Sequence, residues 1–104
     1  MKNYRVNISE EAKQDVSDIF EYIAFKLCAP LAALNLNNAF TEEFTRLRNF
    51  PLSGTVFTDK RLNGVYRWVK VKNYSIFYTV DERTETVYIA RILYSASNYK
   101  SILS

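Results

Sequence analysis

The sequence contains no histidine and very little cysteine or glycine, and these absences exclude several classes of active site. It has a single cysteine, Cys28, and only two glycines, Gly54 and Gly64. Without histidine, neither a His-based nuclease nor a Cys–His nucleophile can be built, and without a glycine-rich segment there is no phosphate-binding loop. A lone cysteine cannot form an intrachain disulfide, which fits a reducing compartment. We therefore expect no metal, nucleotide or other cofactor.

Long apolar runs are also missing, although 48% of the 104 residues are hydrophobic. The first residues, MKNYRVNIS, lack the apolar region of a signal peptide, and no run is long enough to span a membrane. The expectation is a cytoplasmic protein with no membrane partner. Its length suits one domain over residues 1–104 with a core of its own.

Charge is modest but unevenly placed. The net charge is +3. Residues 1–52 hold six Lys/Arg and seven Asp/Glu, a charge of −1, whereas residues 53–104 hold eight and four, a charge of +4. The surplus indicates an acidic partner, either nucleic acid or polypeptide, and the alternative is a solvated basic surface.

The first half of the chain predicts a strand followed by two helices. Residues 3–8 alternate as a half-buried strand does, and Ser9 has the chemistry of a helix N-cap. Apolar residues then recur at steps of three and four until about Cys28, and Pro30 starts a second helix over residues 31–47. The pair is expected to form an antiparallel helical hairpin.

The second half predicts a three-stranded antiparallel meander. A connector over residues 49–64 with Pro and Gly leads into three β-branched and aromatic runs, at residues 65–71, 74–80 and 87–93. A short final helix or an irregular tail would follow. The fold class is α+β, with one curved sheet.

Both rows of side chains on these strands are largely apolar, yet one hairpin can cover only one face of a sheet. We expect the other face to be a binding surface. If the turn at Lys72 has two residues, Arg67 shares a face with Ile76 and Tyr78, and if it has three, Trp68 does. The sequence leaves this register open.

The order of these elements resembles the RelE/ParE superfamily of toxins from type II toxin–antitoxin systems. The resemblance is carried by residues 4–23, 47–54 and 66–93, and it covers nearly the whole chain. It implies a toxin neutralised by a cognate antitoxin whose extended segment wraps it, with a homodimer or a toxin–antitoxin heterotetramer as the assembly. On the open face, the expected antitoxin contacts are Val65, Val69, Phe77, Ile89 and Leu93.

The resemblance also implies one of two targets. RelE-like members cut mRNA on the ribosome, whereas ParE-like members inhibit DNA gyrase. Val69 and Ser75 stand where a RelE-like chain is expected to carry Lys and Arg, so the ParE-like branch fits better, although Tyr94 and Ser97 replace the His and Arg usual in its C-terminal motif. A decayed toxin that only binds antitoxin is a third alternative.

Candidate target contacts follow from charge and position: Arg67, Lys70, Lys72, Arg91 and Tyr94. If the chain is an endoribonuclease, Arg67 with Tyr94 or Tyr99 would supply the chemistry. The competing interpretation of Arg67 is an ion pair with a helix carboxylate such as Asp15, and for Arg91 a buried or rim pair. The competing interpretation of the lysines is a solvated surface, and that of the aromatic residues is sheet core.

Overall fold

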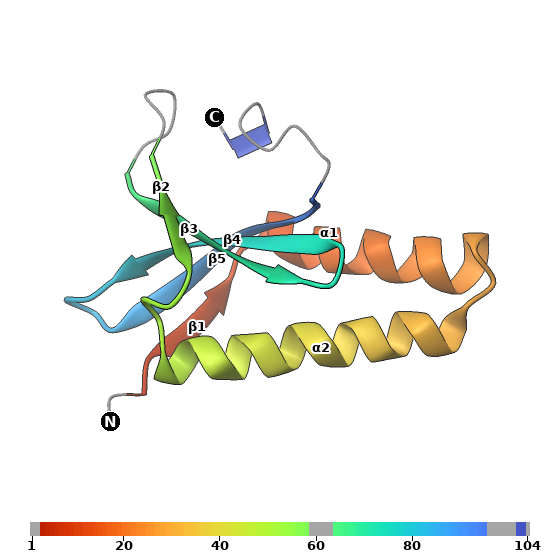
Figure 1. The fold of residues 1–104 in the computed structure, drawn as a ribbon, viewed down its shortest axis with the longest axis horizontal. Coiled ribbons are helices and arrows are strands. Elements are labelled where there is room, and N and C mark those ends of the chain that lie inside the picture. Colours follow the sequence, from red (N-terminus) through yellow and green to blue (C-terminus); the bar gives the residue numbers. More distant parts are fainter. Residues whose placement is uncertain (1–2, 59–63, 96–101, 104) are drawn as a thin grey trace.

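A computed structural model describes residues 3–58, 64–95 and 102–103. The predicted α+β class is confirmed: a five-stranded sheet packs against two helices (Figure 1). A short π-helical segment, η1, ends the first helix. The elements are β1 (Arg5–Ile8), α1 (Glu10–Glu21), η1 (Tyr22–Lys26), α2 (Pro30–Asn49), β2 (Thr55–Phe57), β3 (Tyr66–Val71), β4 (Tyr74–Asp81) and β5 (Thr86–Tyr94).

The sheet has the strand order β1-β5-β4-β3-β2. The predicted meander is present as β3, β4 and β5, each antiparallel to the next. Two pairings were not predicted. β1 lies parallel to β5, with Val6 opposite Val87, and the connector contains the short strand β2, with Val56 opposite Arg67. β1, which was predicted as a strand, and β2, which was not, form the two edges of the sheet.

The turn between β3 and β4 has two residues, Lys72 and Asn73, because Val71 pairs with Tyr74. Lys72 has a φ of 54°, the left-handed conformation that such turns use. This register places Arg67 and Val69 on the same face as Tyr78 and Ile76. One of the two alternatives left open by the sequence is thereby selected.

A bulge interrupts the pairing of β4 with β5. Phe77 lies opposite Arg91 and Tyr78 opposite Ile89, so Ala90 is an extra residue in β5. Strict alternation breaks there. Ile89 and Ile92 both point to the helix-covered face, whereas Arg91 and Leu93 fall on the other face.

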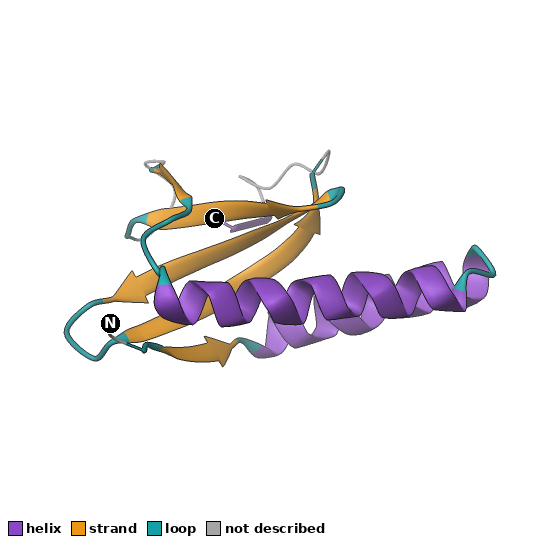
Figure 2. Cartoon of the chain, turned by 60° about the horizontal axis from the view of Figure 1, so that its bottom comes forward, coloured by secondary structure: helices purple, strands orange, loops and turns teal. Residues whose placement is uncertain are grey.

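The core lies between the sheet and the helices, which cover the same face (Figure 2). The Ser9 side chain caps α1 as predicted, accepting a hydrogen bond from the Ala12 backbone N–H. Both helices contribute to a continuous buried cluster with β3, β4 and β5. Its members are Ala12, Leu36, Phe40, Leu47, Val69, Val71, Ile76, Tyr78, Val87, Ile89 and Ile92.

The far face of the sheet does not carry the exposed apolar row that the sequence suggested. Phe77 and Leu93 are only 3% and 8% exposed. Phe57 of β2 lies edge-on against Phe77, with ring centroids 5.8 Å apart, because β2 extends the sheet beside β3. Of the alternative C-terminal helix, only Ile102 and Leu103 belong to the described residues, and both have helical geometry.

Candidate functional site

A groove of about 770 Å³ lies between the helical hairpin and the sheet. The hairpin projects beyond the end of the sheet where β3 turns into β4, which leaves its inner side uncovered there (Figures 1 and 2). Both layers line the groove. The lining residues are Tyr22, Ile23, Leu27, Ala29, Ala32, Asn35 and Leu36 from the hairpin and Lys72, Asn73, Tyr74 and Tyr94 from the sheet.

Aromatic rings of Tyr74 and Tyr94 line the sheet side of this groove. The Tyr74 ring stands edge-on to Phe40 at 6.0 Å and to Tyr94 at 5.8 Å between centroids. Burial, together with the neighbouring phenols of Tyr94 and Tyr22, raises the pKa of Tyr74, so its hydroxyl is neutral at physiological pH. An apolar groove with a few phenol hydroxyls and the Lys72 amine suits a segment with apolar anchors and a polar edge.

The predicted target contact Arg67 is engaged within the molecule. Its Nη1 donates to the backbone oxygens of Leu52 and Gly54, at 3.0 and 3.1 Å. The Tyr78 hydroxyl holds the same connector by accepting from the Gly54 N–H at 2.9 Å. Arg67 therefore anchors the connector, and the interpretation that it pairs with Asp15 is wrong.

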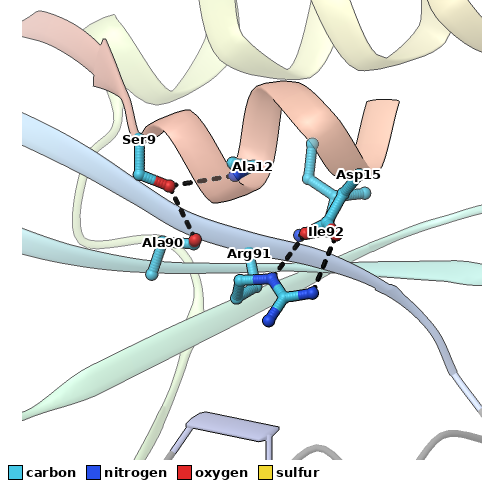
Figure 3. A network of polar contacts seen from close by, with 6 residues as sticks. All are labelled: Ser9, Ala12, Asp15, Ala90, Arg91 and Ile92. Carbon is cyan, nitrogen blue, oxygen red and sulfur yellow. Dashed lines mark hydrogen bonds and ion pairs between the residues drawn. The ribbon is translucent and has the colours of Figure 1, made fainter. Parts of the chain in front are cut away.

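Arg91 is the partner of Asp15. Its Nε and Nη2 donate to the two carboxylate oxygens at 2.7 and 2.8 Å, and the backbone N–H of Ile92 donates to the same carboxylate at 3.0 Å (Figure 3). Hydrogen bonding to Asp15 raises the pKa of Arg91 further. The pair that the sequence offered for Arg91 is thus confirmed, and it ties α1 to β5.

The Ser9 hydroxyl extends this contact by donating to the Ala90 carbonyl at 2.8 Å, beside the bulge (Figure 3). β1 ends opposite Ile89, so the edge of β5 beyond that point has no strand beside it in the described structure. Ser9 and Asp15 satisfy backbone groups of that edge instead. We call Ser9, Asp15 and Arg91 the α1–β5 clasp.

The remaining predicted target contacts lie on opposite sides of the sheet. Lys70 borders a hollow of about 230 Å³ on the far face, with Trp68, Ser75, Phe77 and Ser95. Lys72 and Tyr94 line the groove on the helix side. Tyr99 lies outside the described residues. The structure therefore does not bring the predicted set together.

The predicted antitoxin contacts do not share one exposed surface either. Val69 and Ile89 are buried beneath the helices, whereas Phe77 and Leu93 are buried on the far face. Val65 alone among the five is exposed, at 54%. They do not form the single open face that was expected, because the turn register and the Ala90 bulge together decide which face each residue occupies.

The sequence reasoning missed Tyr22, Leu27 and Tyr74 as groove residues. Tyr22 and Leu27 are 52% and 55% exposed, although Leu27 belongs to the apolar stripe expected to face the core. A weak signal was present, since residues 27–41 contain no charged side chain. A solvated helix face normally carries some.

Membrane-spanning helices and metal-binding clusters are both absent from the described residues. None of their helices combines the length and the apolar character needed to cross a membrane. Nor do three His, Cys, Asp or Glu side chains gather anywhere in this part of the chain to hold a metal ion.

The sequence matches a known protein family over most of its length. Residues 6–99 match the sequence model of the family described as "ParE toxin of type II toxin-antitoxin system, parDE". No curated protein sequence matched.

Solved structures share the fold at low sequence identity. A chain of the chromosomal ParDE system from P. aeruginosa superimposes with a TM-score of 0.70 at 18% identity, covering 88% of this chain and 95% of that one. A chain of the RelBE2 toxin–antitoxin complex from Mycobacterium tuberculosis gives 0.64 at 23%, covering 93% and 97%. One from the archaeal RelE–RelB complex of Pyrococcus horikoshii gives 0.64 at 15%, covering 90% and 97%.

Proposed function

Because the chain belongs to the ParE toxin family of type II toxin–antitoxin systems, we propose that it arrests growth by binding DNA gyrase, without cutting RNA. A cognate antitoxin would hold it inactive. Both parts of the proposal agree with the ParE-like branch that the sequence resembles.

One observation carries the choice of a non-catalytic toxin: the candidate catalytic groups do not converge. RNA cleavage through a 2′-hydroxyl needs a base, an acid and cations around one phosphate. Arg67 is bonded to the connector and Arg91 to Asp15, while Lys70 and Tyr94 lie on opposite faces of the sheet. Of the candidate catalytic groups, Arg67 holds the connector carbonyls, Tyr94 lines the groove and Tyr99 lies outside the described residues.

Lys70 is the target contact that we retain. It is exposed on the far face, beside the half-buried Trp68, and its side chain makes no hydrogen bond or ion pair to another residue of the described ranges. A cation next to an aromatic ring can bind an acidic protein surface without any catalytic partner. This contact would lie opposite the helices.

The antitoxin would occupy the groove between hairpin and sheet. Groove residues Tyr22, Leu27 and Tyr94 are each more than half exposed, so a docked apolar segment would bury surface that is in water in the free chain. Lys72 at the rim offers a cation to an acidic residue of that segment. The three similar structures named above come from toxin–antitoxin systems, which supports a partner of this kind.

The decisive experiment induces the chain in bacterial cells without antitoxin and follows growth, gyrase-linked DNA breaks and mRNA cleavage on ribosomes in parallel. We expect growth arrest with DNA breaks and, with purified proteins, inhibition of gyrase supercoiling. Lys70→Ala should weaken that inhibition. Lys13→Ala is the matched control, because Lys13 is an exposed cation on α1, away from the far face.

The other outcomes are equally informative. Early mRNA cleavage that disappears in Lys70→Ala would replace gyrase by the ribosome as the target and would assign the far-face hollow to RNA. Soluble, well-expressed protein with no effect on growth would identify a decayed toxin. Binding of the cognate antitoxin that is insensitive to Tyr22→Ala and Tyr94→Ala would exclude the groove as its docking site.

A further inference from the structure

The tip of the helical hairpin, residues 22–34, carries exposed apolar side chains that point in several directions. Tyr22 and Leu27 line the groove between hairpin and sheet and are 52% and 55% exposed. Phe25, 73% exposed, borders a hollow of about 470 Å³ that shares no residue with the groove. Leu31 and Leu34, 69% and 49% exposed, line neither. A partner docked on one side of the tip would leave the other apolar side chains in water.

The tip projects from the rest of the molecule. The longest dimension is 43 Å, and the tip lies at one end of it, with the β4–β5 turn toward the other (Figure 1). The exposed apolar residues lie between Tyr22 and Leu27 on one arm and between Leu31 and Leu34 on the other, about 5–8 Å along each helix axis at 1.5 Å per residue. Apolar faces of peripheral helices enter a bilayer to a similar depth of roughly 5–10 Å.

Charge around the tip is sparse and mostly positive. Between Glu21 and Glu42 there is no acidic residue, and the only charged side chain is the exposed Lys26. The hollow beside Phe25 is bordered by Glu21 and, further from the tip, by Lys13, whereas Lys72 borders the groove. Glu21 is thus the one carboxylate beside the tip surfaces, against three lysines. Lysines next to an apolar surface favour contact with anionic lipid headgroups.

The backbone of the tip is largely bonded within itself. The Leu27 N–H donates to the Tyr22 carbonyl and the Ala29 N–H to the Ile23 carbonyl, both at 3.0 Å. Pro30, which begins α2, has no N–H to satisfy. Unpaired backbone donors are costly where water is scarce, so a turn bonded in this way can enter the headgroup region at low cost.

We propose that the hairpin tip inserts into the surface of a lipid bilayer, with Phe25, Leu27 and Leu31 as its apolar anchors. A bilayer surrounds whatever enters it, so it can bury side chains on all sides of the tip at once. Tyr22 and Lys26 suit the headgroup level, where amphipathic rings and lysines are favoured. The insertion is peripheral, since none of the described helices can cross a membrane. The expectation of no membrane partner rested on the lack of a spanning run, which such an insertion does not need.

A polarity-sensitive dye on Cys28 tests the insertion directly. Cys28, the only cysteine, is exposed at the tip. The emission of the labelled chain should shift to the blue when mixed phosphatidylcholine–phosphatidylglycerol vesicles are added. The matched control combines Cys28→Ser with Glu82→Cys, which moves the dye to the exposed β4–β5 turn, far from the tip (Figure 1). Its emission should not change.

Co-sedimentation of the unlabelled chain with the same vesicles measures the strength of binding. Phe25→Ser with Leu31→Ser should lower the partition coefficient about tenfold or more, because two large apolar anchors are lost. Val65→Ser should leave it unchanged, since Val65 is 54% exposed but lies just before β3. Circular dichroism confirms that the variants are folded.

Three results would overturn the proposal. The first is a wild-type chain that neither shifts its emission nor sediments with vesicles. The second is binding that persists in the double variant and disappears in about 0.5 M salt, because the basic sheet half alone would then hold the lipid. The third is a blue shift that grows with protein concentration without lipid, which would mean that another protein chain buries the tip. The choice of target is tested separately, because the double variant keeps Lys70 and should still inhibit gyrase.

Discussion

The α1–β5 clasp should contribute more to stability than an ordinary surface ion pair. Asp15 and Arg91 are only 12% and 28% exposed at their side chains, and the Ile92 N–H, on a residue 1% exposed, also depends on the carboxylate. Asp15→Ala would leave that N–H without its acceptor, at a cost of about 1–3 kcal/mol. It would also leave a partly buried guanidinium unpaired, which solvent relieves only in part.

We therefore expect Asp15→Ala to lower the free energy of unfolding by about 3 kcal/mol. With a urea dependence of about 2 kcal/mol per molar, the unfolding midpoint falls by roughly 1.5 M. Fluorescence of Trp68, the only tryptophan, reports the transition from a site outside the clasp. Arg91→Ala should cost less, because the carboxylate then keeps the Ile92 N–H.

A double-mutant cycle completes the measurement. Asp15→Ala combined with Arg91→Ala should cost less than the sum of the two single changes, since each single change already removes the pair. A loss below about 0.5 kcal/mol for Asp15→Ala, as for an exposed pair, would refute the reasoning. If Arg91 contacted the target, Arg91→Ala would abolish growth inhibition while Asp15→Ala, at similar protein abundance, would not. We expect no such difference.

Three further predictions concern the connector clamp of Arg67, Tyr78 and Gly54. Gly54→Ala should destabilise the fold by about 1–3 kcal/mol, because its new Cβ would lie 2.9 Å from Cε1 of the Tyr78 ring. Gly54→Ala should cost less stability in a Tyr78→Phe background than in the wild-type chain, and chemical denaturation measures this difference. Arg67→Ala should lose about 1–2 kcal/mol in the same assay by removing both carbonyl contacts. Burial raises the pKa of Tyr78 above its ordinary value of about 10, so the folded chain holds this proton more tightly than the unfolded chain. Stability should therefore be retained below about pH 10 and fall as pH rises toward the folded-state pKa, with a smaller fall in Tyr78→Phe, measured by thermal unfolding at several pH values.

The parts of the fold that could be predicted are those set by neighbouring residues. The helical hairpin follows from apolar spacing and Pro30, the first cap from Ser9, and the meander from three β-branched runs. β2 escaped prediction because a three-residue strand has no pattern of its own and exists only through pairing with β3. The parallel pairing of β1 likewise depends on residues at the far end of the chain.

The candidate site was harder to predict because the sequence does not show which group of the folded chain a charged side chain will bind. Arg67 and Arg91 have similar surroundings along the chain, yet one binds connector carbonyls and the other a helix carboxylate. The face occupied by Leu93 depended on a bulge that inserts a single residue, Ala90, into β5. The hairpin groove forms only where two elements separate in space, so no local pattern marks it.

The pairing of β1 with β5 also makes completion of the sheet wait for the synthesis of β5. The Ser9 hydroxyl and the Ala90 carbonyl it meets are 81 residues apart, which a ribosome elongating at about 5–20 residues per second covers in roughly 4–16 s. During that interval the first strand has no neighbour to join. Each nascent toxin therefore lacks its finished sheet until translation has passed β5, which gives an antitoxin made alongside it time to be present.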